Sequence, residues 1–384
     1  KEDLISLKIR NLSTTSSISS NGPIKVDQSL NNLIVKWPNI KTRYSYIWLR
    51  DNCQCSECMH PDNKQKLHPS ADVPLDIKPL SMTTTDDEIT IVWDKPLRKQ
   101  SDDELPHQST YEFSFLKHYS SRDATISKRR NDSTQVVWDG ALMEEKNIWV
   151  DCHEYMNSDK TLLAVLKQLW SYGLAFLYNV PTKDQEIVKI VTRIGSLKNT
   201  FYGPTWDVKS VPGAKNIAYT NLELGLHMDL LYTEAPPGLQ FLHCLQNTVT
   251  GGRSIFADSL AAVYNLRQRH PDAYQLLKQT PLTFHYVNDG HHVHFNRPAI
   301  VEDLHNNTLT QFADCIEDPR LQFELRLNPG ELVIMANRRI LHARRAFDPY
   351  SGERHLKGAY LEYCEFKDKL RVLLAAEGNG SLQE

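Results

Sequence analysis

Short apolar segments separated by glycine and proline fill the chain beyond residue 195, and they constrain its fold more than any other feature. In order they read LQFLHCL, SIFADS, LTFHYV, VHFN, ELVIMAN and LKGAYLEYC. One helical insert, SLAAVYNLRQRHPDAYQLLKQ, interrupts them. Many short strands with turn signals and few helices are typical of a barrel or a jelly roll. The expected class is therefore α/β, with strands in the majority.

Two helices and a strand are expected ahead of this region. In DKTLLAVLKQLWSYG the apolar residues recur with helical spacing, and Gly173 is a natural end point. LAFLYNV then has the composition of a buried strand. KDQEIVKIVTRIG predicts a second helix that ends at Gly195. These helices would flank the β structure.

The amino-terminal part of the chain has a different texture. LIVKWPN, YSYIWLRDN and DEITIVWD alternate apolar and polar residues, as half-buried strands do. Polar segments such as LRKQSDDELPHQ follow them. We therefore expect a small β module over residues 1–115, a linker over residues 116–145 and a larger domain over residues 146–384.

Composition limits the classes of partner. The chain has 384 residues and a net charge of -3 without a long basic block, so we expect no nucleic-acid partner. No apolar run approaches the ~18 residues of a membrane span, so we expect no membrane partner. The odd number of cysteines, seven, favours reduced thiols over a disulfide framework. We expect an intracellular protein of the cytoplasm or the mitochondrion, and a removed transit peptide ahead of Lys1 leaves that choice open.

The segment LGLHMDLLYTEAPPG places one histidine and one aspartate in an apolar run. His227 and Asp229 are two positions apart, so on a strand their side chains point to the same face. An imidazole and a carboxylate begin a facial triad, which holds a metal and leaves coordination positions open. His342, just after the apolar segment ELVIMAN, is the candidate for the third ligand. The alternative is a core histidine beside an aspartate in a turn.

An arginine and a glycine-rich turn strengthen the metal hypothesis. Arg354 follows His342 closely, and arginine grips a carboxylate through two parallel hydrogen bonds. VTGGRSIFADS supplies a turn that leads into a strand. A cosubstrate with a carboxylate would need such an anchor. An ordinary surface arginine is the alternative for Arg354.

In this order, HMD, TGG, LH and RHL resemble the Fe(II)- and 2-oxoglutarate-dependent dioxygenases of the taurine dioxygenase-like superfamily. More narrowly, the chain is similar to the γ-butyrobetaine and trimethyllysine dioxygenases in WLRDNCQCSEC, TFYGPTW, NIAYT, LHMD, PPGLQFLHCL, TVTGG, LHARRAF and RHLKGAY. The resemblance implies a double-stranded β-helix (jelly-roll) catalytic domain and a homodimer. It implies that His227, Asp229 and His342 hold iron, that Arg354 anchors 2-oxoglutarate, and that dioxygen and ascorbate, as reductant, take part.

Three cysteines crowd into CQCSEC. Cys53, Cys55 and Cys58 suit tetrahedral zinc, which needs a fourth ligand. Spacing alone leaves His60, His68 and His107 as candidates, and clustered free thiols are the alternative. The resemblance favours His107, at the start of HQSTYEF. Structural Zn(II) would then staple the amino-terminal module, whose core is otherwise thin.

Aromatic residues suggest a pocket for a quaternary ammonium group. Aromatic faces attract cations, and cages of this kind recognise trimethylammonium groups, although such residues more often belong to a core or an interface. The resemblance assigns the cage to Tyr202, Trp206, Tyr219 and Tyr360. It also implies that Asn216 faces a substrate carboxylate, where the trimethyllysine enzymes have an aspartate. Asn296, in HFNRPAI, is a second candidate contact.

One position departs from the family pattern. Leu230 directly follows Asp229, where the butyrobetaine enzymes carry a tyrosine that helps to hold the substrate carboxylate. A missing hydroxyl leaves a buried carboxylate less satisfied, by roughly 1–3 kcal/mol. The expected function is hydroxylation of γ-butyrobetaine to carnitine. Trimethyllysine hydroxylation, a paralogue with another small substrate, and a scaffold with an inactive iron site are the alternatives.

Overall fold

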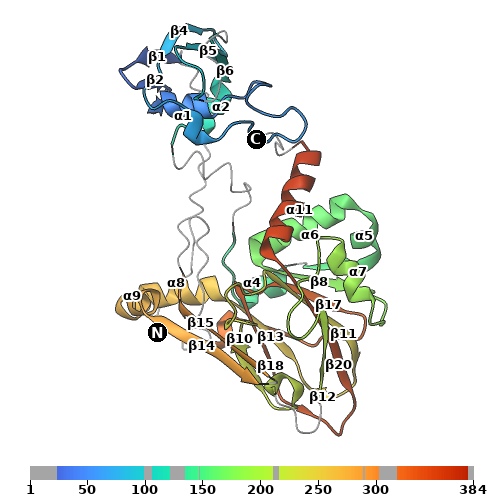
Figure 1. Ribbon diagram of the computed structural model, residues 1–384. Coiled ribbons are helices and arrows are strands. Elements are labelled where there is room, and N and C mark those ends of the chain that lie inside the picture. Colours follow the sequence, from blue (N-terminus) through green and yellow to red (C-terminus); the bar gives the residue numbers. More distant parts are fainter. Residues whose placement is uncertain are drawn as a thin grey trace. The chain divides into compact units, whose positions relative to one another are not determined.

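The computed structural model describes residues 24–98, 106–121, 135–146, 148–210, 216–288, 290–301 and 318–378 (Figure 1). The chain divides into two compact units, residues 1–132 and residues 133–384. Each unit has its own hydrophobic core. No described helix has both the length and the apolar character that crossing a bilayer requires.

The first unit contains two three-stranded antiparallel sheets and short helices. One sheet has β1 (Lys25–Gln28), β2 (Asn32–Lys36) and β3 (Lys41–Ser45), and the other has β4 (Pro79–Thr84), β5 (Glu88–Trp93) and β6 (Gln108–Glu112). The segment EITIVW buries every second residue, so it forms β5 as predicted. The short helices are α1 (Tyr46–Asp51), η1 (Ser70–Asp72) and α2 (Phe113–His118).

The strand predicted for YSYIWLRDN is wrong for most of that segment. Only its first two residues belong to β3, and the next six form α1. Tyr46, Leu49 and Arg50 are the buried residues of this helix, a spacing of three and four that fits a helical turn. The apolar run Tyr-Ile-Trp-Leu satisfies either periodicity, so the sequence alone did not separate a helix from a strand.

The second unit is mainly β and is built on two large sheets. One has the order β10 (Leu224–His227), β18 (Ile340–Arg344), β13 (Ser254–Asp258), β16 (Gln322–Leu325). The other has the order β7 (Trp149–Asp151), β8 (Leu174–Tyr178), β17 (Leu332–Ala336), β11 (Leu239–Asn247), β20 (Arg354–Leu361), β9 (Thr205–Lys209). Only the β7–β8 pair is parallel among these described strands.

Buried aromatic rings join the two sheets. Phe176 of β8 lies edge-on to Phe256 of β13, with ring centroids 5.7 Å apart, and to Phe323 of β16, at 6.3 Å. The small pair β12 (Thr250–Gly251) and β19 (Phe347–Asp348) and the hairpin of β14 (Pro281–Asn288) and β15 (His291–Pro298) complete the strands. This arrangement of packed antiparallel sheets is consistent with the predicted jelly roll.

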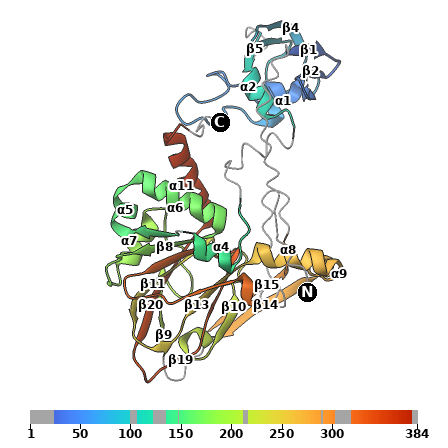
Figure 2. The same cartoon turned by 180° about the vertical axis from the view of Figure 1, so that it is seen from behind.

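Helices flank the second unit, as Figures 1 and 2 show. The predicted helix before Gly173 is confirmed as α6 (Asp159–Tyr172), which ends at Gly173 with φ of 74°. It packs on α11 (Tyr363–Ala376), β8 and β17, while α7 (Glu186–Thr192), the second predicted helix, packs on β20 and β11. Among the described residues, the remaining α-helices of this unit are α4 (Gly140–Glu145), α5 (Cys152–Asn157), α8 (Ser259–Arg269) and α9 (Pro271–Gln279).

Three helical features differ from expectation. The single insert is two helices, α8 and α9, because Pro271 cannot donate a backbone hydrogen bond and starts a new helix. The strand in LKGAYLEYC ends at Leu361, and α11 begins two residues later. Residues 135–145, inside the predicted linker, contain α4, and Trp138 and Met143 belong to the core of the second unit.

Candidate functional site

Two neighbouring strands bring the predicted iron ligands together. His227 ends β10 and lies directly opposite His342 of β18, and Asp229 follows in the next turn. Oδ1 of Asp229 is 3.4 Å from Nε2 of His227 and 3.9 Å from Nε2 of His342. All three ligand atoms lie within 4.8 Å of one another. Two imidazoles and a carboxylate on one face form the donor set of a facial triad for Fe(II).

The carboxylate and one imidazole are in the forms that suit a metal. Burial raises the pKa of Asp229, but its hydrogen bond and electrostatic attraction with His227 outweigh burial and hold that pKa far below its ordinary value. Burial and the neighbouring His227 lower the pKa of His342 to about 3, so this ring is neutral. Nδ1 of His227 donates to the carbonyl of Gly225 at 2.8 Å, which leaves Nε2 directed toward Asp229.

Asn337, which the sequence reading missed, holds the backbone of Asp229. It is fully buried in the turn between β17 and β18. Its Oδ1 accepts from the backbone N–H of Asp229 at 2.9 Å, and its Nδ2 donates to the carbonyl of Asp229 at 3.0 Å. The one sequence feature that could have indicated Asn337 is its position directly after the apolar segment ELVIMA. Asn337 fixes Asp229 relative to the strand that carries His342.

Arg354 lies in a cavity shared with Asp229 and His342. Burial, and then the nearby Arg344, lower the pKa of Arg354 to about 10. Its Nε has no hydrogen-bond partner among the described residues. Gly252 of the TGG turn lies beside it, where an added Cβ would be 3.4 Å from Nε. A half-buried arginine whose Nε lacks a partner fits the carboxylate of 2-oxoglutarate.

The predicted cage residues come from several elements. The rings of Trp206 on β9 and Tyr360 on β20 stack with centroids 4.0 Å apart, and the Tyr360 hydroxyl donates to Oδ2 of Asp229 at 2.6 Å. Nδ2 of Asn216 is 3.4 Å from the hydroxyl of Tyr202. Tyr219 ends the short helix η2 (Ile217–Tyr219), and burial and the charge of Asp229 raise its pKa. Of these five residues, Tyr360 contacts Asp229 directly and Trp206 lines the same cavity as Asp229.

Asn296 does not join this group. It lies opposite Thr283 in the hairpin, and both residues are on its exposed face. Tyr286 on β14 points the other way and stacks on Phe201 and on Tyr232, with centroids 5.2 Å and 5.1 Å apart. Because neighbouring residues of a strand face opposite sides, Asn296 is on the wrong face to contact a substrate with the others.

The aromatic residues Phe201, Tyr232 and Tyr286 were missed by the sequence reading. Phe201 also contacts Tyr202, with ring centroids 4.4 Å apart. Burial and a hydrogen bond with Tyr202 raise the pKa of Tyr232 well above its ordinary value. Tyr232 stands three residues after Asp229, so its position near the ligand was the one usable signal. Leu230 itself is buried, with φ of 58°.

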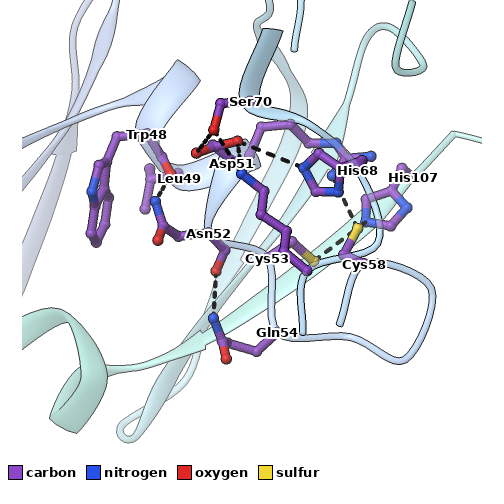
Figure 3. A network of polar contacts seen from close by, with 12 residues as sticks. Trp48, Leu49, Asp51, Asn52, Cys53, Gln54, Cys58, His68, Ser70 and His107 are labelled. Carbon is purple, nitrogen blue, oxygen red and sulfur yellow. Dashed lines mark hydrogen bonds and ion pairs between the residues drawn. The ribbon is translucent and has the colours of Figure 1, made fainter. Parts of the chain in front are cut away.

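The cysteine cluster of the first unit is also assembled (Figure 3). Nε2 of His107 lies 3.4 Å, 3.7 Å and 3.5 Å from the sulfurs of Cys53, Cys55 and Cys58. Zinc bonds of about 2.3 Å to sulfur and about 2.0 Å to nitrogen at tetrahedral angles separate the two atoms by about 3.5 Å. The set therefore fits Zn(II), with His107 as the histidine.

The other two candidate histidines lie elsewhere. Nδ1 of His60 accepts from the backbone N–H groups of Asp62 and Asn63. Nε2 of His68 faces Asp51 at 3.7 Å. Around the cluster, Arg50 donates to the sulfur of Cys58 at 3.2 Å. The hydrogen bond from Cys53, together with Arg50, lowers the pKa of Cys58, which favours its thiolate form.

Comparison with known proteins identifies the family. Residues 142–308 and 302–360 match the family "Taurine catabolism dioxygenase TauD, TfdA family", and residues 24–117 match "Gamma-butyrobetaine hydroxylase-like, N-terminal". Dioxygenase str8 of Strobilurus tenacellus is 34% identical over 87% of this chain and 86% of the relative. Gamma-butyrobetaine dioxygenase of Pseudomonas sp. (strain AK-1) is 32% identical, over 85% of this chain and 89% of the relative.

A third relative is more distant. Trimethyllysine dioxygenase of Meyerozyma guilliermondii is 27% identical over 88% of this chain and 92% of the relative. The matches thus cover both units and include relatives with two different named substrates. The chain belongs to the TauD/TfdA family, in the group of the γ-butyrobetaine and trimethyllysine dioxygenases, and it is a 2-oxoglutarate-dependent dioxygenase.

Proposed function

We propose that this enzyme hydroxylates a small trimethylammonium substrate, and that the substrate is γ-butyrobetaine, which becomes carnitine. His227, Asp229 and His342 would hold Fe(II), and Arg354 would bind the distal carboxylate of 2-oxoglutarate. When bound, iron with 2-oxoglutarate and dioxygen supplies the oxidising power to hydroxylate an unactivated C–H bond, with succinate and carbon dioxide as coproducts. The protein's own part is binding, orientation and exclusion of water.

The observation that carries the choice of substrate is the amide of Asn216 beside the hydroxyl of Tyr202. The amide of Asn216 carries no charge and can donate a hydrogen bond, which suits a carboxylate better than an ammonium group. An aspartate at this position would favour the amine of trimethyllysine. The relative named gamma-butyrobetaine dioxygenase, at 32% identity, supports the same choice.

The stacked pair refines the expected cage. Trp206 and Tyr360 have ring centroids 4.0 Å apart, so a trimethylammonium group does not fit between them. We infer that the cation meets Tyr202, Tyr219 and the outer face of this pair. Cation–π attraction acts over distances up to about 6 Å from a ring centroid, which such a pocket allows.

Tyr232 compensates for the leucine at position 230 in this proposal. The ring of Tyr232 lies 6.2 Å from that of Phe201, which also contacts Tyr202. A hydroxyl two residues further along the chain would then serve the substrate carboxylate together with Asn216. Tyr232→Phe is therefore expected to raise the KM for the substrate more than it lowers kcat.

Succinate release tests the function directly. The zinc-replete enzyme is given Fe(II), ascorbate, 2-oxoglutarate and a panel of trimethylammonium compounds. We expect γ-butyrobetaine to stimulate succinate release most and to gain one hydroxyl, by mass spectrometry. Stronger stimulation by trimethyllysine would assign the runner-up activity, and no stimulation by any compound would contradict a trimethylammonium substrate.

Asn216→Asp separates the two enzyme activities. We expect it to raise trimethyllysine turnover and to lower γ-butyrobetaine turnover, because a carboxylate attracts an amine and repels another carboxylate. Unchanged preference would refute the assigned role of Asn216. A scaffold with an inactive iron site would instead show no Fe(II)–2-oxoglutarate charge-transfer band in an anaerobic titration.

A further inference from the structure

Both the backbone and the carboxylate of Asp229 have fixed partners. Its backbone N–H and carbonyl both bond to Asn337. Its Oδ2 accepts a 2.6 Å hydrogen bond from the Tyr360 hydroxyl. Its Oδ1 is the oxygen that faces the Nε2 atoms of His227 and His342. The two oxygens of this one carboxylate therefore have different partners.

The ring of Tyr360 is itself fixed. Tyr360 is buried on β20, between β11 and β9 in the sheet order, and it lies opposite Gln240. Its ring stacks on Trp206, and Trp206 lies over Gly358, where any side chain would collide with the indole. A buried, stacked ring loses little further freedom when its hydroxyl bonds to Asp229, so the bond is preorganised.

We propose that Tyr360 is a positioning residue for the iron ligand Asp229: its hydroxyl holds Oδ2 and so presents Oδ1 alone to the metal. A carboxylate with both oxygens free can rotate, or can bind an ion with both oxygens and occupy one coordination position more. The facial triad depends on open positions for the cosubstrate and dioxygen. Tyr360 thus keeps Asp229 a one-oxygen ligand, whichever substrate the enzyme uses.

This role is separable from the cage. Tyr360→Phe keeps the aromatic ring and its stacking on Trp206, and it removes only the hydroxyl. Partners of metal ligands typically change metal affinity by about 10–100-fold when they are lost. We expect Tyr360→Phe to weaken Fe(II) binding by a factor in that range.

Anaerobic titration measures the effect without turnover. Zinc-replete protein at saturating 2-oxoglutarate is titrated with Fe(II), and the charge-transfer band of the ternary complex reports occupancy. We expect a higher half-saturation concentration and a shifted band for Tyr360→Phe. Because no substrate is present, the result stands even if γ-butyrobetaine is not turned over.

Tyr155→Phe is the matched control. Tyr155 is a fully buried tyrosine of the same unit, and its hydroxyl donates to the carbonyl of Ile190 at 3.0 Å. This variant also loses one buried hydroxyl bond, but not at the iron site. Equal Fe(II) affinity in Tyr360→Phe and wild type would overturn the proposal. An equal loss of affinity in Tyr155→Phe would overturn it too, because general loosening would then explain the effect.

Discussion

His243 is a buried base that the site does not use. It lies on β11 with no exposed surface, and neither ring nitrogen has a hydrogen-bond partner among the described residues. Burial lowers its pKa from 6.5 to about 4. The ring is therefore neutral in the folded chain at neutral pH, and the unfolded chain binds a proton more readily.

This difference predicts acid sensitivity. Between about pH 6.5 and about pH 4 the unfolded state holds more protons than the folded state, so the free energy of unfolding falls as the pH falls. At the acid end of this window, the buried His243 has lowered the free energy of unfolding by about 3 kcal/mol relative to neutral pH. Urea unfolding of wild type and His243→Leu at several pH values measures it. We expect a shallower pH dependence in the variant, and parallel curves would contradict the assignment.

The clustering of the proposed iron ligands could be predicted from the sequence, whereas the residues that support them could not. His227 and Asp229 carry a two-residue spacing that a strand converts into one face. Asn337 and Tyr286 reach the site through tertiary packing, whereas Tyr232 follows Asp229 by only three residues and could have been noticed. Asn296 was predicted as a substrate contact from its residue type, but it lies on the face of its strand that points away from the other predicted contacts.

Strand β20 illustrates how one element serves the site. It begins with Arg354, ends near Tyr360, and lies between β11 and β9. Gly358, opposite Trp206, has no side chain, so the indole can lie flat on the strand. An added Cβ would lie 2.6 Å from Nε1 of Trp206.

Gly358→Ala is therefore expected to displace Trp206. Overpacking of this kind costs about 1–3 kcal/mol of unfolding free energy, and the loss of the stack on Tyr360 should weaken ammonium binding. Urea unfolding and the substrate KM measure the two effects. Gly225→Ala is the control for stability, because nothing lies within 4 Å of an added Cβ there. Equal stability of both variants would show that Trp206 does not depend on Gly358.

Helices and strands were predictable where length and periodicity agreed. In α6, fourteen residues with helical spacing, followed by Gly173, left one interpretation. In α1, six mostly apolar residues fitted both periods, and packing decided. Helix α11 was missed because the strand pattern of LKGAYLEYC runs into its first turn.

At the scale of the whole molecule, the two units have separate cores but different means of stabilisation. The first unit is small, and a small domain buries a lower fraction of its surface. We propose that Zn(II) bound by Cys53, Cys55, Cys58 and His107 supplies the stabilisation that this small core lacks. The free energy of metal binding then contributes to the free energy of folding. The larger core of the second unit contains no residue of this cluster.

Loss of zinc should therefore unfold only the first unit. Cys55→Ser is expected to lower the zinc content and to lower the melting temperature of the segment 24–117, while Fe(II)–2-oxoglutarate binding persists. Elemental analysis and hydrogen exchange measure these outcomes. Cys364→Ser is the control, because Cys364 is exposed and outside the cluster. Full stability of Cys55→Ser without zinc would show that the metal is dispensable for folding.

The segments that carry the aromatic rings differ in secondary structure from the strands that carry the two histidines. Tyr202, Tyr219 and Tyr232 lie in turns or short helical segments, whereas two of the three proposed iron ligands are strand residues. Loops accept substitutions that a paired strand does not. New substrates can thus be acquired by exchanging surface turns over an unaltered oxidising centre, which accounts for relatives that share a reaction and differ in the molecule they modify.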